Sequence, residues 1–231
     1  MNLAVIPARG GSKRIPKKNI KPFLGKPIVN YAIDLAKSSK LFDEIIVSTD
    51  DDEINKIIIQ QGVKNPFKRS AETSGDFATL SDVLLEILNE YKKLNISIDN
   101  VCVILPTSPL ITTEILNTAH EKFISGDFSA VIPLVKYNHP IQRALKITGD
   151  NGNVVMIDPE NQTKRTQDCD EAFYDSGQFY WLKASDFLIE KKILMKNAGS
   201  IELNPDHCHD IDNPEDWKIA EMKYRWLNPL R

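Results

Sequence analysis

A loop rich in glycine and basic residues follows the first apolar run of the sequence. Residues 9–21 carry six cations and no acid. Glycine lets a backbone approach a ligand closely and point N–H groups at it, and cations neutralise phosphate. The loop is neither a Walker loop nor a dinucleotide-binding glycine motif. A solvated basic loop is the alternative, but paired glycines directly after a buried strand favour a triphosphate site that uses Gly10, Arg9, Lys13 and Lys18.

Two aspartates lie two residues apart near the end of the chain, as Asp210-Ile211-Asp212. In an extended segment, residues i and i+2 face the same side, so both carboxylates can reach one Mg²⁺ ion. An enzyme that uses a triphosphate needs such an ion to bridge phosphate oxygens and to offset developing charge. The local sequence is equally compatible with a second interpretation, in which Asp212 only assists the start of the last helix.

Two other clusters resemble metal sites but have simpler explanations. Residues 50–52 are three consecutive aspartates, of the kind that glycosyltransferases use to bind a metal. We favour instead the capping of a helix N-terminus by Asp50 or Asp51. Residues 207–209 read His-Cys-His, but no second Cys/His pair lies at zinc spacing, so we interpret them as loop residues. Cys102, inside a predicted strand, is assigned to the core.

Hydrophobic periodicity predicts the elements that must position these residues. Apolar runs predict buried strands at residues 3–6, 44–48, 101–105, 130–135 and 177–182. Amphipathic patterns predict helices at residues 27–38, 51–61, 79–93 and 112–124, and a last helix with Asn213 as N-cap and Pro214 in its first turn. Strands that alternate with helices predict an α/β fold, a Rossmann-like, mostly parallel sheet flanked by helices. Ligands of such sheets bind beyond the carboxyl ends of the strands, where the basic loop begins.

The alternation breaks between residues 136 and 176. This segment contains two β-like pieces, at 144–147 and 154–157, and several turn signals. It is too long and too β-like for a plain loop, so we expect it to pack on something, as a lid or a dimer arm. The length of the chain supports a single domain, residues 1–231, that carries this excursion.

The composition limits the classes of function. Hydrophobic residues make up 42% of the chain and charged residues 26%, as in ordinary globular proteins. A net charge of −3 disfavours general binding to nucleic acids or anionic membranes. No stretch approaches the roughly 18 apolar residues of a membrane span, and the N-terminal apolar run is too short for a signal peptide. Three irregularly spaced cysteines suit a reducing compartment, so we expect a cytoplasmic protein.

Five motifs, in order along nearly the whole chain, resemble those of the cytidylyltransferases that activate nonulosonic acids, the CMP-sialic acid synthetase family. They are residues 6–13 followed by Lys18-Asn19, residues 48–50, residues 69–72 with Asp76 and Thr79, residues 106–110, and residues 210–212. The resemblance implies the nucleotide-diphospho-sugar transferase type of Rossmann-like fold. The chain departs from the family pattern at Leu105 and Ile111, where the family often has Gln and Arg and where a base or sugar contact is expected.

The resemblance also implies a reaction. The anomeric hydroxyl of a sugar acid would attack the α-phosphate of CTP and release pyrophosphate, with Lys18 nearest the reacting phosphorus and Mg²⁺ held by Asp210 and Asp212. The remaining contacts to CTP would come from Arg9, Ser12, Asn19, Arg69 and Thr79. Family members are homodimers, and the segment 136–176 resembles the arm that reaches the partner's active site.

We predict pseudaminic acid as the acceptor, because the later part of the arm looks more like the pseudaminic acid branch of the family. Where sialic acid enzymes often carry Lys, this chain has a glutamine, but two arginines of the arm could each bind a carboxylate through paired hydrogen bonds. A phenol, a carboxylate and an amide close to the returning strand could read acylamino and hydroxyl groups, while Phe179 and Trp181 face the core. The predicted sugar-binding residues are Gln142, Arg143, Arg165, Tyr174, Asp175 and Gln178.

Three alternatives stay open at this stage. The acceptor could be another sugar acid, such as legionaminic, N-acetylneuraminic or 3-deoxy-manno-octulosonic acid. A glycosyltransferase that uses residues 50–52 would consume a nucleotide sugar and release no pyrophosphate from CTP. A nucleotide-binding protein without catalytic activity is disfavoured, because the chain retains both Asp210 and Asp212.

Overall fold

One sheet of seven strands organises the protein, and the computed structural model describes residues 1–229. Its strands are β1 (Asn2–Pro7), β4 (Glu44–Ser48), β5 (Asn100–Ile104), β6 (Ala130–Lys136), β9 (Phe173–Asp175), β10 (Phe179–Lys183) and β11 (Ala198–Glu202). They are ordered β11-β6-β10-β5-β1-β4, and β9 pairs with β6. The neighbouring pairs are parallel, except that β10 lies antiparallel between β5 and β6, and β9 lies antiparallel to β6. The prediction of a mostly parallel α/β sheet is confirmed, whereas strand–helix alternation could not reveal the reversed β10.

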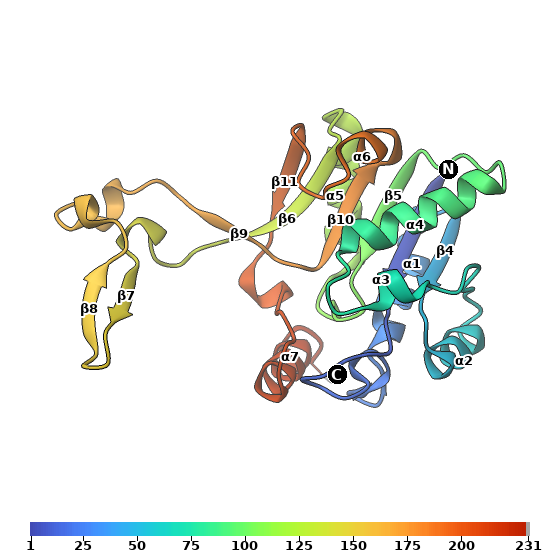
Figure 1. The fold of residues 1–231 in the computed structure, drawn as a ribbon, viewed down its shortest axis with the longest axis horizontal. Coiled ribbons are helices and arrows are strands. Elements are labelled where there is room, and N and C mark those ends of the chain that lie inside the picture. The colour runs from blue at the N-terminus through green and yellow to red at the C-terminus, as the bar shows by residue number, and fades with distance from the viewer. Residues whose placement is uncertain (230–231) are drawn as a thin grey trace.

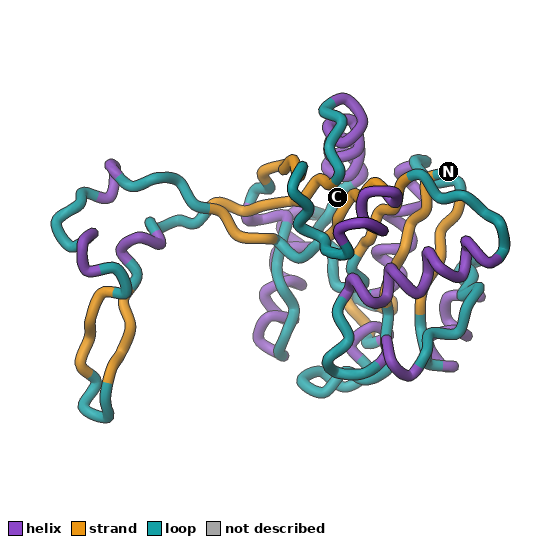
Figure 2. Tube along the Cα trace, turned by 45° about the horizontal axis from the view of Figure 1, so that its top comes forward, coloured by secondary structure: helices purple, strands orange, loops and turns teal. Residues whose placement is uncertain are grey.

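Helices cover both faces of this sheet (Figure 2). One face packs against α1 (Val29–Ser39), α2 (Asp52–Gln60) and α5 (Thr113–Ser125), and the other against α4 (Leu80–Lys93) and α6 (Ala184–Glu190). Strand β1 serves both layers, because Ala4 and Ile6 point into the first and Leu3 and Val5 into the second. No helix in residues 1–229 has the length and apolar character needed to cross a membrane.

The last helix, α7 (Pro214–Leu227), packs on the beginning of the chain (Figure 1). Near the start of the chain, β2 (Pro22–Phe23) and β3 (Lys26–Pro27) form a small hairpin. Its residue Phe23 lies edge-on to Trp217 of α7, with the two ring centroids 5.6 Å apart. Asn213 accepts hydrogen bonds from the N–H groups of the first turn and Pro214 follows it, so the predicted N-terminus of this helix is confirmed. This packing brings residues 210–212 beside the basic loop.

Between β6 and β9 the chain leaves the sheet and forms an arm that projects from the body (Figure 1). Phe173–Asp175 already pairs with β6, so the arm consists of residues 137–172, and the predicted range of 136–176 is a few residues too long at its ends. The arm contains β7 (Leu145–Thr148), β8 (Asn153–Met156) and the 3-10 turns η2 (Ile141–Arg143), η3 (Pro159–Asn161) and η4 (Thr166–Asp168).

The β7–β8 hairpin presents an apolar face to solvent. Leu145 pairs with Met156, and Ile147 pairs with Val154 across the two strands, so these four side chains share one face. Ile147 is 75% exposed and Leu145 is 61% exposed. A lone two-stranded hairpin is marginally stable in water, so this face is unusual for a segment that packs on nothing.

Several short or irregular elements do not follow from the sequence pattern. Among them are η1 (Lys18–Ile20), α3 (Ala71–Ser74), α6, β11 and η5 (Pro205–His207). In β11 the reason is visible, because a Cβ atom on Gly199 would meet the ring of Phe128 at 2.6 Å. The strand therefore carries a glycine that weakens its local signal, and the packing of Phe128 against the sheet requires it.

Candidate active site

A cavity of about 240 Å³ opens at the carboxyl ends of β1 and β5. Its walls come from the basic loop after β1, the segment that leads into α4, and the loop after β5. Six of the seven residues predicted to bind the nucleotide line this cavity, namely Arg9, Ser12, Lys18, Asn19, Arg69 and Thr79. The structure thus brings together residues that lie up to 70 positions apart in the sequence, at the edge of the sheet where ligands of this fold class bind.

The basic loop is held in place by hydrogen bonds within the loop and to the segment just before α2. Asn19 donates a side-chain hydrogen bond to the carbonyl of Arg9 at 2.9 Å. The Gly10 N–H donates to Asp50 at 3.0 Å, so in this structure it does not point into the cavity as predicted. A Cβ atom on Gly10 would lie 2.5 Å from a carboxylate oxygen of Asp51, so glycine is required here for close approach to the protein itself.

The three consecutive aspartates, residues 50–52, bind groups of the protein itself. Asp51 is the N-cap of α2 and accepts hydrogen bonds from the N–H groups of Glu53 and Ile54. Asp50 holds Gly10, and Asp52 is exposed and pairs with Lys68. Helix capping, the favoured interpretation of residues 50–52, is therefore confirmed.

Arg69 is a buried cation with unused hydrogen-bonding capacity. Its Nε donates to the Ser48 hydroxyl at 3.1 Å, and its backbone N–H donates to the Thr49 carbonyl. Burial lowers the pKa of Arg69, while the nearby Asp50 carboxylate opposes this effect. Its buried Nη2 has no hydrogen-bond partner within residues 1–229. Because an unpaired buried donor is costly, an acceptor on a bound nucleotide would complete this site.

The segment that leads into α4 lines another part of the cavity and supplies partners for the cations of the basic loop. Thr79 is the N-cap of α4, where its hydroxyl accepts from the Asp82 N–H and donates to the Asp82 carboxylate, so its contact to a nucleotide remains a prediction. Arg9 donates to the Gly75 carbonyl at 2.9 Å and pairs with Asp76. Lys13 forms a close ion pair with the same carboxylate and lowers the pKa of Asp76.

Lys18 connects the cavity to the two C-terminal aspartates. Its side chain lines the cavity, and its ammonium donates to the carbonyl of Ile211 at 2.7 Å and lies 3.8 Å from the Asp212 carboxylate. Burial lowers the pKa of Lys18, and the charges of Asp212 and Asp210 partly offset this effect. Ile211 is fully buried in the cluster beneath α7, so the flanking aspartates are turned away from that cluster, as an extended segment requires.

The two aspartates fit a magnesium site that is completed by a ligand. The protein around Asp210 removes part of its hydration and raises the pKa of its carboxyl group, and repulsion from Asp212 adds to the increase. A bound cation would relieve both effects. No group of three His, Cys, Asp or Glu side chains within residues 1–229 is arranged to hold a metal alone. Mg²⁺ commonly takes one or two carboxylates and fills its other positions with water and phosphate, which agrees with this donor set.

The predicted sugar-binding residues of the arm are not gathered at this cavity. Gln142 donates to the carbonyl of Asp170 at 3.1 Å, and Arg143 donates to the carbonyl of Lys164 at 2.9 Å. Arg165 forms two hydrogen bonds with the Asp168 carboxylate, at 2.7 and 3.1 Å. All of these contacts stay within the arm, which projects away from the body (Figure 1).

The other three predicted sugar residues lie where the arm returns to the sheet. Asp175 accepts from the Gly177 N–H and from the Tyr180 hydroxyl, both at 2.9 Å. Gln178 is buried, and its side-chain amide donates to the Ser176 carbonyl, while the oxygen Oε1 of the same amide has no partner within the described residues. Tyr174 lies against Tyr137, with ring centroids 5.0 Å apart. Their roles in sugar recognition remain predictions.

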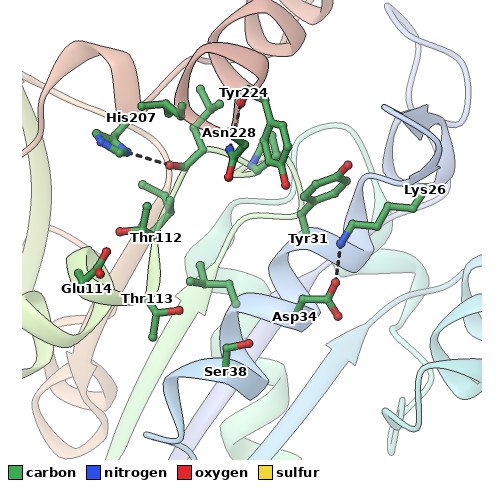
Figure 3. A pocket seen from close by; sticks show the side chains of 15 residues that line it. Lys26, Tyr31, Asp34, Ser38, Thr112, Thr113, Glu114, His207, Tyr224 and Asn228 are labelled. Carbon is green, nitrogen blue, oxygen red and sulfur yellow. Dashed lines mark hydrogen bonds and ion pairs between the residues drawn. The ribbon is translucent and has the colours of Figure 1, made fainter. Parts of the chain in front are cut away.

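A larger cavity, of about 400 Å³, lies between α1, the start of α5 and α7 (Figure 3). None of the residues predicted to bind nucleotide, sugar or metal lines it, although Ile111, where the family pattern places a contact, does. Its lysine, Lys26, is paired with Asp34 and lies over the ring of Tyr31, and Glu114 adds a further negative charge. A cavity with this charge balance does not suit a triphosphate, so we assign the nucleotide site to the smaller, cationic cavity.

Sequence reasoning missed the role of Arg14. This residue reaches the Asp212 carboxylate with two hydrogen bonds, although the two residues are 198 positions apart in the chain. The basic loop itself was recognised, but local spacing carries no signal for a partner so distant. The contact depends on the packing of α7 against the start of the chain.

The chain is similar to several known proteins. Residues 3–207 match the cytidylyltransferase family. The chain is 37% identical to a pseudaminic acid cytidylyltransferase of Campylobacter jejuni, over 97% of this chain and 96% of that protein. It is 34% identical to an N-acylneuraminate cytidylyltransferase of Oncorhynchus mykiss, over 95% of this chain and 49% of that protein. Its fold resembles that of a CMP:2-keto-3-deoxy-manno-octonic acid synthetase complexed with CTP, with a TM-score of 0.71 and 14% identity over 99% of each chain.

Proposed function

The chain belongs to the cytidylyltransferase family, and on this premise we propose that it transfers CMP from CTP to the anomeric hydroxyl of a nonulosonic acid. The hydroxyl oxygen attacks the α-phosphorus, the bond to the bridging oxygen breaks, and pyrophosphate leaves. The observation that carries this proposal is the position of Lys18, which lines the cationic cavity and also reaches the segment of Asp210 and Asp212. A phosphoryl group between Lys18 and a cation held by the two aspartates would meet positive charge from both sides.

We propose pseudaminic acid as the acceptor. Support comes from the 37% identity over nearly the full length with a relative named for this sugar. The test is kcat/KM for pseudaminic, legionaminic, N-acetylneuraminic and 3-deoxy-manno-octulosonic acids, measured by pyrophosphate release at fixed CTP and Mg²⁺. A site built to hydrogen-bond particular groups rejects analogues that lack them by large factors. A preference for one of the other acids would overturn the acceptor while leaving the cytidylyltransferase assignment in place.

We propose that Asp210 and Asp212 hold Mg²⁺ together with the phosphates of CTP. The bound ion would offset the charge that develops on the reacting phosphate and on pyrophosphate. Two observations support this proposal. The pKa of Asp210 is raised by burial and by the charge of Asp212, and both aspartates flank the buried Ile211, which places them on the same side of the segment. Titration with Mg²⁺ after treatment with a chelator tests this, because pyrophosphate release should depend on the added ion.

We propose that the protein works as a homodimer in which the arm of each protomer covers the other. The support is the apolar face of the β7–β8 hairpin, which lies exposed in the single protomer. Apolar faces of this kind mark interaction surfaces, and homo-oligomers with twofold symmetry are the commonest assemblies. Light scattering at micromolar concentration tests the assembly, and a fully active monomer would refute it.

The glycosyltransferase alternative loses its basis, because Asp50 and Asp51 bind backbone N–H groups of the protein. A cytoplasmic location remains a prediction from the cysteines, and all three are free thiols. The absence of nucleic-acid binding remains a prediction from the net charge of −3. Competition between CTP and a nonspecific DNA duplex in a fluorescence assay would test the latter.

A further inference from the structure

The Asp212 carboxylate is already occupied by a cation of the protein. Arg14 donates from Nη1 to Oδ2 at 2.9 Å and from Nη2 to Oδ1 at 2.8 Å. Each carboxylate oxygen therefore accepts one of two parallel N–H···O bonds from the guanidinium, the paired geometry that makes arginine–carboxylate contacts strong and specific. By contrast, no hydrogen bond or ion pair within residues 1–229 involves the Asp210 side chain.

A divalent ion cannot join this arrangement without a penalty. An ion bound to Asp212 would lie within a few ångströms of the Arg14 guanidinium, and the two positive charges would repel each other. Lys18, 3.8 Å from the same carboxylate, adds to that repulsion. The penalty disappears when an anion draws Arg14 away from Asp212, and the phosphates of a nucleotide are such an anion.

The rest of the basic loop shows the same pattern. Lys13 and Arg9 pair with Asp76, and Lys17 pairs with Glu53. The loop is thus neutralised by acids from three other segments of the protein. Arg14 and Lys18 differ from these cations because their partner Asp212 is one of the two proposed metal ligands, and only Arg14 donates to both oxygens of that carboxylate.

We propose that Arg14 is a positioning residue that holds Asp212 in the free protein and passes to the triphosphate when nucleotide and metal bind together. This inference rests on the proposed function. The exchange makes metal binding and nucleotide binding mutually dependent, because each ligand removes one partner of the Arg14–Asp212 pair. A metal ion without nucleotide therefore binds weakly.

The test measures binding of Mn²⁺ alone, a paramagnetic substitute for Mg²⁺, through the electron paramagnetic resonance signal of the free ion. Three proteins are compared without nucleotide: wild type, Arg14→Gln and Lys13→Gln. Lys13→Gln removes the same charge from the same loop but releases Asp76, so it controls for the general loss of positive charge. The Arg14–Asp212 pair is partly exposed, so Arg14→Gln should bind Mn²⁺ roughly two- to fivefold more tightly than wild type. Lys13→Gln should match wild type.

A second measurement repeats the titration with CTP present. Wild type should then bind Mn²⁺ as tightly as Arg14→Gln or more tightly, because the phosphates have taken Arg14 from Asp212. Equal Mn²⁺ affinity of wild type and Arg14→Gln without nucleotide would overturn the inference, as would an equal gain in Lys13→Gln. Asp212→Ala should lose Mn²⁺ binding, and retention there would also overturn it.

Failure of the inference is distinguishable from failure of the proposed function. Pyrophosphate release by the wild-type protein with CTP and a sugar acid tests the function independently of Arg14. Activity in wild type, combined with unchanged Mn²⁺ binding in Arg14→Gln, would remove the exchange and leave the cytidylyltransferase. Thermal unfolding of each variant establishes that it is folded.

Discussion

The basic loop after β1 and the arm differ in where their side chains find partners. In the loop, Asn19 ties back to Arg9, and Ile15 is buried in the cluster beneath α7. In the arm, Ile147 and Leu145 of the hairpin point their apolar side chains into solvent. The loop is held by other residues of the chain, whereas the arm presents an apolar face that no residue among 1–229 covers.

Under the proposed function, this difference would divide the active site into two halves. The half that would bind CTP is assembled on the carboxyl edge of the sheet, where Arg69 still has an unused donor. The half that would bind the sugar has its arginines in the arm, with Arg143 and Arg165 bonded to neighbouring arm residues. We therefore expect nucleotide binding to survive changes in the arm, and transfer to the acceptor to depend on both regions.

The largest effect is expected from Asp212→Ala, which alters the segment that contacts the basic loop. Loss of this carboxylate removes half of the proposed metal site, so pyrophosphate release should fall by at least two orders of magnitude, roughly the effect of removing a charge-stabilising group. The fold should persist, because Asn213 and Asp216 still cap α7. Asp206→Ala, an exposed acid in the same segment, is the matched control and should retain activity. Near-normal turnover of Asp212→Ala would contradict the metal assignment.

Lys18→Ala tests the same region at the reacting phosphate. If the ammonium stabilises charge that appears only in the transition state, kcat should fall about a hundredfold or more, with a smaller change in the KM for CTP. Lys17→Ala is the control, because Lys17 is the adjacent residue and pairs with Glu53 at the surface. An effect confined to the KM for CTP would show that Lys18 only binds the nucleotide.

Ile147→Asp tests the arm. A charge on the apolar face should prevent another protomer from packing there, because burying an unpaired carboxylate is costly. We expect a monomer by light scattering, a loss of acceptor turnover of at least about tenfold, and CTP binding within about twofold of wild type. Lys146→Asp places the same residue on the opposite face of the hairpin and should leave the dimer intact. A dimer that survives Ile147→Asp would show that this face is not the contact.

The sheet was largely predictable because its strands carry strong local signals. The buried runs of β4 and β6 and the amphipathic pattern of α4 were recognised with bounds within a residue or two of the structure. β11 was missed because the ring of Phe128 requires Gly199, and a glycine within a short run hides a strand. The direction of β10 was not predictable from its sequence, because an apolar run has the same pattern in either direction.

Parts of the candidate site were predictable where a local sequence signal, such as an adjacent strand or a two-residue spacing, marks the residues. The basic loop and the aspartates of residues 210–212 were found because each follows a recognisable element or spacing. The Arg14–Asp212 pair could not be found, because it depends on the packing of Trp217 and Phe23 at opposite ends of the chain. The sugar residues of the arm are a different case, since under the proposed dimer their surroundings would include surfaces of a second protomer.

Asp175 lies where the arm returns to the sheet. The substitution Tyr180→Phe tests whether Asp175 stabilises the sheet or binds the sugar. Burial and the Asp175 carboxylate raise the pKa of Tyr180, so its hydroxyl stays protonated and donates to that carboxylate. Removing the donor should lower the free energy of unfolding by about 1 kcal/mol in urea denaturation, with little change in the acceptor KM. Tyr174→Phe is the counterpart, because the Tyr174 hydroxyl makes no hydrogen bond in residues 1–229, and it should raise the acceptor KM without loss of stability. If Tyr180→Phe instead leaves stability unchanged and raises the acceptor KM, then Asp175 reads the sugar, and the sugar half of the site begins inside the sheet.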